Sequence, residues 1–187
     1  MVSSLDGCLV THRHGDHSKS VGKLLERGIP VYGNKDLLAF NSDITYQKKL
    51  QWFHVGTFDV LPFDVKHDVE CYGFYIKSTV TNETLLYITD AAYCQYTFPE
   101  INYLLIEANY AQKQIFNAVE NRETAGYLAE RIVQTHMCIE TLLGFLKSNN
   151  LSGLKKIFLL HLSDKHSNEK DFKNKVESMT NAEVCVA

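Results

Sequence analysis

The sequence predicts a mixed α/β fold in which strands lead and amphipathic helices cover them. Two observations support this prediction. Short apolar runs rich in β-branched and aromatic residues recur along the chain, and segments with a helical spacing of apolar residues accompany them. The pattern leaves both an α/β and an α+β layering open. At 187 residues the chain is long enough to bury a core, and it is most simply one domain over residues 1–187.

The N-terminal part of the chain predicts alternating strands and short helices. Ser18 is expected to cap a helix whose apolar face consists of Val21, Leu24 and Leu25, at i, i+3 and i+4. The predicted elements, in order, are a strand at 7–11, a helix that ends at Gly28, a strand at 30–32 and a helix at 34–40.

The middle of the chain predicts β structure. Apolar and polar residues alternate roughly in FDVLPFDVKHD, and the residues VTNE between two further runs are typical of a hairpin. The predicted strands lie within residues 58–68, 71–79, 84–91 and 103–109.

The last third of the chain predicts helices followed by buried strands. Ala125, Leu128, Ala129, Ile132 and Val133 form one apolar stripe, and a second stripe follows in residues 139–146. A buried strand at 156–163, a helix at 168–179 and a strand at 183–187 complete the predicted order.

Composition excludes several classes of protein. No apolar run approaches the roughly 20 residues of a membrane helix, and the N-terminus lacks the pattern of a signal peptide, so a cytoplasmic protein without membrane contact is expected. The net charge of −3 gives no global attraction to nucleic acid, although bound metal ions would add local positive charge. The scattered cysteines, which form no CxxC pair, argue against disulfides and thiolate zinc sites; they are Cys8, Cys71, Cys94, Cys138 and Cys185.

The segment THRHGDHSKS, residues 11–20, concentrates potential metal ligands. Because alternate residues of an extended segment point the same way, His12 and His14 can reach one metal ion. Asp16 and His17 lie where a helix begins, so their side chains can face a neighbouring point. Two ligand groups separated by one bend suit two metal ions about 3.5–4 Å apart. An exposed polar loop is the alternative interpretation, but this spacing disfavours it.

Three further ligand candidates follow predicted strands. His67 follows FDVK, Asp90 follows LLYIT, and His161 follows IFLL, so each side chain is expected to emerge at a sheet edge. Alone, a histidine in such a place is more often a structural residue, and Asp90 could cap a turn or a helix. Together with the cluster at 12–17, the three indicate a metal site.

These motifs resemble those of the metallo-β-lactamase superfamily. The order His-x-His-x-Asp-His, then His67, then Asp90 in YITDAA, then His161 in LLHLSDKHSN is similar to the metal-binding motifs of that family. The segments LLIEANY, Thr135-His136-Met137 and HLS resemble the phosphodiesterase branch, which includes ribonuclease Z and the YycJ (WalJ)-type exonucleases. The resemblance runs from Leu5 onward and implies an αββα sandwich.

The resemblance also implies a dinuclear site. His12, His14 and His67 would bind one metal ion, Asp16, His17 and His161 the other, and Asp90 both. Two divalent ions are implied, zinc first, with manganese or iron as alternatives. A metal-activated water would attack the substrate, and Asp16 or Asp90 would orient it.

This sequence departs from the family pattern at its N-terminus. Family members usually carry extra strands, a Gly/Ser/Asn-rich loop and an early aspartate ahead of the His-x-His motif, whereas eleven residues precede His12 here. The expectation is an N-terminally shortened fold, with a sheet edge that a homo-oligomer would cover.

Three residues outside the ligand set are candidates for contact with substrate. His136 precedes the stripe at 139–146, so its ring is expected near a helix N-terminus, where it would bind phosphate or donate a proton to the leaving oxygen. A capping role is the alternative for His136. Asn109 would hydrogen-bond a ligand histidine or the substrate, and His166 shares a loop with His161.

Three functional hypotheses follow. The first is a dinuclear phosphodiesterase acting on nucleic acid. The second is a hydrolase of small esters, thioesters or lactones with the same fold, and the third is a non-catalytic relic that keeps the metal ions. The HLS and THM segments favour the first.

Overall fold

The computed structural model describes residues 5–187 and divides into two compact units. The first unit comprises the chain up to Asp64 together with Val69–Asn82. The second comprises Val65–Asp68 and Glu83–Ala187. That residues 1–187 form a single domain stays a prediction.

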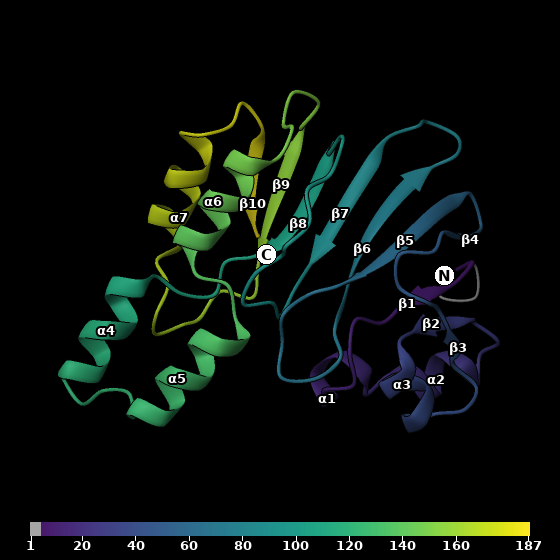
Figure 1. Cartoon of the computed structure of the whole chain (residues 1–187), viewed down its shortest axis with the longest axis horizontal. Coiled ribbons are helices and arrows are strands. Elements are labelled where there is room, and N and C mark those ends of the chain that lie inside the picture. The colour runs from purple at the N-terminus through teal and green to yellow at the C-terminus, as the bar shows by residue number, and fades with distance from the viewer. Residues whose placement is uncertain (1–4) are drawn as a thin grey trace. The chain divides into compact units, whose positions relative to one another are not determined.

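The first unit contains a small parallel sheet, a set of antiparallel strands and three short helices among its described residues (Figure 1). The parallel sheet has the order β1-β2-β3, and β5 pairs antiparallel with both β4 and β6. The strands are β1 (Cys8–Leu9), β2 (Val31–Gly33), β3 (Thr45–Tyr46), β4 (Phe53–Val55), β5 (Phe58–Asp64) and β6 (Tyr72–Ser78). The helices are α1 (Gly15–Ser18), α2 (Val21–Leu25) and α3 (Lys35–Phe40).

The core of this unit confirms the helical face predicted after the histidine cluster. Val21 of α2 is buried, and Leu24 and Leu25 pack against the same cluster. The buried members of the cluster are Val10, Val21, Val31, Leu37 and Ile44.

The predicted cap at Ser18 is wrong. Ser18 ends α1, and α2 begins three residues later at Val21. The Ser18 hydroxyl instead donates to the carbonyls of Arg13, at 2.9 Å, and His14, at 3.0 Å. These bonds close the turn after the His-x-His motif.

The second unit contains four parallel strands in the order β10-β9-β8-β7. Because the strands are parallel, their carboxyl ends meet at one edge, and that edge carries the candidate site residues of this unit. The strands are β7 (Thr84–Ile88), β8 (Tyr103–Glu107), β9 (Lys156–Leu160) and β10 (Glu183–Val186). The helices are α4 (Gln112–Glu120), α5 (Gly126–Thr135), α6 (Ile139–Ser148) and α7 (Glu169–Glu177). Figure 1 shows α4 and α5 next to each other and α6 and α7 beside β9 and β10.

Two features of this unit differ from the sequence expectation. Helix α4 had no counterpart among the predicted elements, because only Ile115 and Ala118 of its nine residues are buried. The stripe predicted at 125–133 does lie on a helix, yet Leu128 and Val133 are exposed and only Ala129 of the stripe is buried. Among the described residues, no helix has the length and apolar character needed to cross a membrane.

Candidate metal centre

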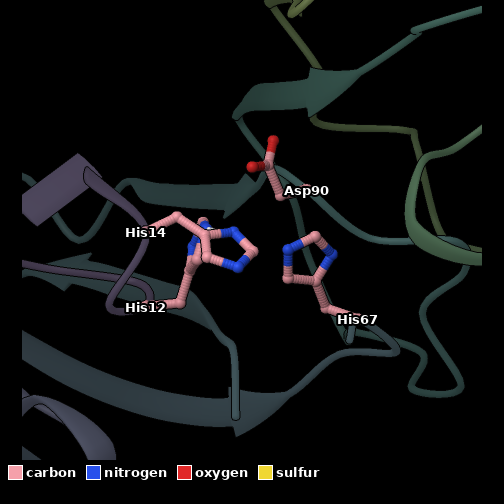
Figure 2. A group of neighbouring side chains, drawn as sticks. All are labelled: His12, His14, His67 and Asp90. Carbon is pink, nitrogen blue, oxygen red and sulfur yellow. Dashed lines mark hydrogen bonds between the residues drawn. The ribbon is translucent and has the colours of Figure 1, made fainter. Parts of the chain in front are cut away.

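His12 and His14 turn ring nitrogens toward each other. His12 is buried, and its Nε2 lies 3.0 Å from His14 Nδ1, with the two rings nearly perpendicular (Figure 2). Two imidazole nitrogens on one tetrahedral zinc ion, with bonds of about 2.0–2.1 Å, would lie roughly 3.3 Å apart. The observed separation therefore fits two ligands of one metal ion after a small adjustment.

Neighbouring residues hold this pair in place. The Thr11 hydroxyl lies 2.9 Å from His12 Nδ1. The Thr11 carbonyl accepts hydrogen bonds from the Tyr72 backbone, at 2.9 Å, and from Asn34 Nδ2, at 3.2 Å. Fixing Nδ1 of His12 leaves Nε2 as the nitrogen that faces His14, which is how outer contacts orient metal-binding histidines.

Asp16 and His17 lie on the single turn of α1. The His17 ring is 4.2 Å from the His12 ring, measured between centroids, and Asp16 Oδ2 lies 3.5 Å from His17 Nε2. The first unit thus brings together all four polar residues of the motif, with His12 buried and Asp16 exposed.

His67, in the second unit, is oriented in the same way. Its Nδ1 lies 3.0 Å from the Thr135 carbonyl, which can only accept, so Nδ1 carries the proton and Nε2 is the nitrogen left to bind a metal ion. The candidate ligand atoms of His67 and Asp90, both drawn in Figure 2, lie within 4.8 Å of one another. Asp68 also approaches His67, with Oδ1 at 3.1 Å from Nε2.

Asp90 follows β7 and His161 follows β9, the strands on either side of β8, and both residues have an unusual backbone conformation. Both have left-handed φ angles, 49° for Asp90 and 57° for His161, which non-glycine residues rarely adopt. Asn109 Nδ2 donates to the His161 carbonyl at 2.7 Å and so helps to hold that conformation. The result is a 2.7 Å contact between Asp90 Oδ1 and His161 Nδ1. Strained residues of this kind cluster at functional sites.

Glu107, which the sequence-based site does not contain, lies at the centre of this edge. It ends β8 and is fully buried. One carboxylate oxygen accepts from the backbone of Ala91, at 2.8 Å, and of Met137, at 3.2 Å. The other lies 2.7 Å from His136 Nδ1 and 3.0 Å from His161 Nδ1. These four hydrogen-bond partners offset the free-energy cost of burying the Glu107 carboxylate. The signal for it was an acidic residue that ends the apolar run YLLIE.

The donor set of this edge fits a divalent metal ion. Asp90, Glu107, His136 and His161 each offer a ligand atom, and these atoms lie within 4.8 Å of one another. Hydrogen bonds that His161 donates to Asp90, first, and to Glu107 raise the pKa of His161 to about 10. Without a metal ion, His161 would therefore carry a proton between two carboxylates, in a place where a bound metal ion would supply the positive charge.

Metal binding should consequently release a proton. A raised pKa means that His161 is protonated at neutral pH, whereas a histidine ligand must be neutral, so the metal ion has to displace that proton. We expect the apparent metal affinity to rise about tenfold per pH unit between roughly pH 7 and 9. Calorimetric titrations in buffers of different ionisation enthalpy measure the release. An affinity that stays constant across this range would contradict it, and Glu107→Gln should reduce the release.

The remaining predicted residues have clear places in the second unit. His136 follows α5, is partly exposed, and lies 5.1 Å from the His161 ring between centroids. Asn109 makes the bond to His161 described above, which is a contact with a candidate ligand histidine. His166 is buried, with its ring nitrogens 2.9 Å from the Thr124 hydroxyl and 3.3 Å from the Ser163 hydroxyl, and burial lowers its pKa. A substrate contact by His166 stays a prediction.

Comparison with known proteins identifies the fold. No family model matches the sequence, and no curated protein matches it significantly. Among solved structures, the metallo-β-lactamase fold protein YhfI from Bacillus subtilis matches with a TM-score of 0.72 and 18% identity, over 100% of this chain and 76% of YhfI.

Two other matches carry different activities. The short form of human tRNase Z matches with a TM-score of 0.61 and 18% identity, over 100% of this chain and 78% of that protein. CmlA from Streptomyces venezuelae, a diiron β-hydroxylase, matches with a TM-score of 0.62 and 11% identity, over 95% of this chain and 43% of CmlA. One fold hosts several chemistries, so these matches establish architecture alone. The chain has the metallo-β-lactamase fold.

Proposed function

We propose that this protein is a dinuclear metal-dependent phosphodiesterase that hydrolyses nucleic acid. The observation that carries the proposal is the pair formed by His136 and the buried Glu107, beside the candidate ligands Asp90 and His161. A phosphodiester in nucleic acid has a sugar oxygen as a poor leaving group, so its hydrolysis needs a proton donor close to the metal ions. The hydrolysis of thioesters or activated esters depends less on such a donor.

The proposed ligand set draws on both units. His12, His14 and His67 would bind one ion, Asp16, His17 and His161 the other, and Asp90 both. The motif order supports this assignment, as do the facing nitrogens of His12 and His14, the orientation of His67 and the contact of Asp90 with His161.

Zinc is the metal ion we propose first, because imidazole and carboxylate ligands suit it. Manganese and iron accept the same ligands. When bound, the two ions would activate a water molecule and neutralise charge on the phosphate oxygens.

The chain's own residues have three roles in this proposal. His136 donates a proton to the leaving oxygen, and Glu107 holds the Nδ1 side of its ring at 2.7 Å. Asp16 or Asp90 orients the attacking water. Asn109 fixes the backbone of His161. Asn109 and His166 would also contact the substrate.

Nucleic acid is the substrate class that the site favours. The similar fold of tRNase Z, an enzyme named for its action on tRNA, agrees with this choice without establishing it. The charge at the site supports the same choice. The net charge of the chain is −3, but a bound metal pair would create local positive charge that attracts a phosphate backbone.

Turnover of matched substrates tests the proposal. We expect the metal-loaded protein to hydrolyse bis(p-nitrophenyl) phosphate and single-stranded oligonucleotides, and to be inactive after chelation. p-Nitrophenyl acetate and a thioester serve as matched probes of the ester-hydrolase alternative. A larger rate enhancement over the uncatalysed reaction for these esters than for any phosphodiester would reject the proposed function. Two bound metal ions with no turnover of either class would favour a non-catalytic role.

A further inference from the structure

A cavity in the second unit lies against His67. Its volume is about 440 Å³, within the range of pockets that bind small ligands. Four segments form its walls, and the side chains with polar or aromatic groups include Lys66, His67, Tyr93, Gln112, Gln134 and Thr141. Thr135, which directly precedes His136, also lines it. The pocket is therefore next to one proposed metal ligand and one residue away from the proposed proton donor.

Backbone hydrogen bonds join the segment that carries Lys66 to the segment that carries Tyr93. The Ala92 N–H donates to the Lys66 carbonyl at 2.8 Å, and the Lys66 N–H donates to the Tyr93 carbonyl at 3.3 Å. The Tyr93 side chain is nevertheless 51% exposed. An exposed aromatic ring on a fixed backbone is suited to stacking against a flat ligand.

Other residues that line the pocket form hydrogen bonds with one another or with nearby side chains. Tyr110 and Cys138 are buried, and Cys138 Sγ lies 3.1 Å from the Thr141 hydroxyl. Gln112 donates to Cys138 Sγ at 3.6 Å, and Gln134 donates to Glu130 at 3.3 Å. Two carboxamides, which can both donate and accept, thus lie in a pocket with one tyrosine ring available for stacking.

This combination matches a nucleoside and its adjoining phosphate. Stacking on tyrosine recognises the flat face of a base, carboxamides recognise base edges, and a lysine recognises the phosphate backbone. A pocket for a small acyl group would need neither the exposed ring of Tyr93 nor the two glutamine carboxamides. The acidic lining residue Asp68 forms an ion pair with Arg131, which reduces its repulsion of a phosphate.

We infer that this pocket binds the nucleoside next to the scissile phosphate, with Tyr93 stacking on its base and Lys66 contacting the following phosphate. The inference rests on the proposed function, because it takes His67 as a metal ligand and so places the reacting phosphate at the mouth of the pocket.

Binding of two matched probes tests the inference. The probes are a short fluorescein-labelled phosphorothioate oligothymidylate, which resists hydrolysis, and the same backbone without bases. With metal-loaded protein, Tyr93→Ala should weaken binding of the oligothymidylate roughly 5- to 100-fold, as expected for the loss of one stacked base. Binding of the base-free probe should not change, and Tyr93→Phe should keep the affinity of the wild type.

The controls use a second exposed tyrosine and the salt dependence. Tyr127 of α5 is 79% exposed and does not line the pocket, so Tyr127→Ala should bind both probes normally. Lys66→Ala should lower the slope of log Kd against log salt by about 0.7, the value for one phosphate contact on a single strand.

Failure of the inference is distinguishable from failure of the proposed function. Equal losses for both probes, or unchanged binding by Tyr93→Ala while the wild type hydrolyses phosphodiesters, would overturn the pocket assignment and leave the function standing. Base-dependent loss of binding in Tyr93→Ala, with no phosphodiester turnover by the metal-loaded wild type, would support the pocket and reject the hydrolase.

Discussion

Replacement of Asp90 by alanine or asparagine should remove most bound metal and lower phosphodiester turnover by at least about 100-fold. Losing an outer partner of a ligand typically costs 10–100-fold, and Asp90 is proposed to contact both ions directly. The Asp90 side chain is buried and lies 2.7 Å from His161 Nδ1. A residue from the surface therefore cannot take over its role as a ligand. Metal content per chain and turnover on the same sample measure the effect.

The choice of variants separates this loss from unfolding. Asparagine tolerates the left-handed φ of 49° at this position better than alanine, so Asp90→Asn should keep the fold while losing the charge. Glu120→Ala removes an exposed carboxylate from the end of α4 and should leave metal content and turnover unchanged. Normal metal content in Asp90→Asn would refute the role of Asp90 as a ligand.

His136→Ala should keep both metal ions and lose about 10²- to 10⁴-fold in turnover of nucleic acid, the usual contribution of a general acid. The loss should be much smaller on bis(p-nitrophenyl) phosphate, because p-nitrophenolate leaves without a proton. A purely structural histidine would lower both activities equally. Comparing kcat for the two substrates therefore distinguishes proton donation from a packing defect.

Two companion variants sharpen this prediction. Glu107→Gln keeps the shape of the side chain but removes the charge next to His136 Nδ1, so we expect a smaller loss of about 10- to 100-fold with the same dependence on the leaving group. His54→Ala removes an exposed histidine of β4 in the first unit and should be without effect. Unchanged nuclease turnover in His136→Ala would make that residue structural.

Much of the fold could be predicted because its elements carry local signals. The strand runs and the apolar faces of α2 and α6 depend on periodicity that is visible in the chain, and each is present. Helix α4 lacks such a signal because most of its surface is exposed. The cap predicted at Ser18 is wrong because a serine can bond backward to carbonyls as readily as it caps a following helix.

The candidate site likewise has residues that the sequence predicts and residues that only the structure identifies. The motif at 12–17 is detectable from spacing, and strand-end positions point to Asp90 and His161. Glu107 is not predictable from the sequence, because one acidic residue at the end of an apolar run has no distinctive spacing. Its role appears only when β7, β8 and β9 align. The left-handed backbone at Asp90 and His161 likewise depends on tertiary contacts. Cytoplasmic location and homo-oligomerisation stay predictions.

The most direct test of the central claim is the number of metal ions per chain, measured by plasma mass spectrometry after reconstitution with zinc or manganese. The proposed seven-residue site predicts close to two ions in the wild type and a clear loss in both His14→Ala, from the first unit, and His161→Ala, from the second. Retention of two ions by either variant, or no metal ion in the reconstituted wild type, would contradict the dinuclear site and the hydrolytic function built on it.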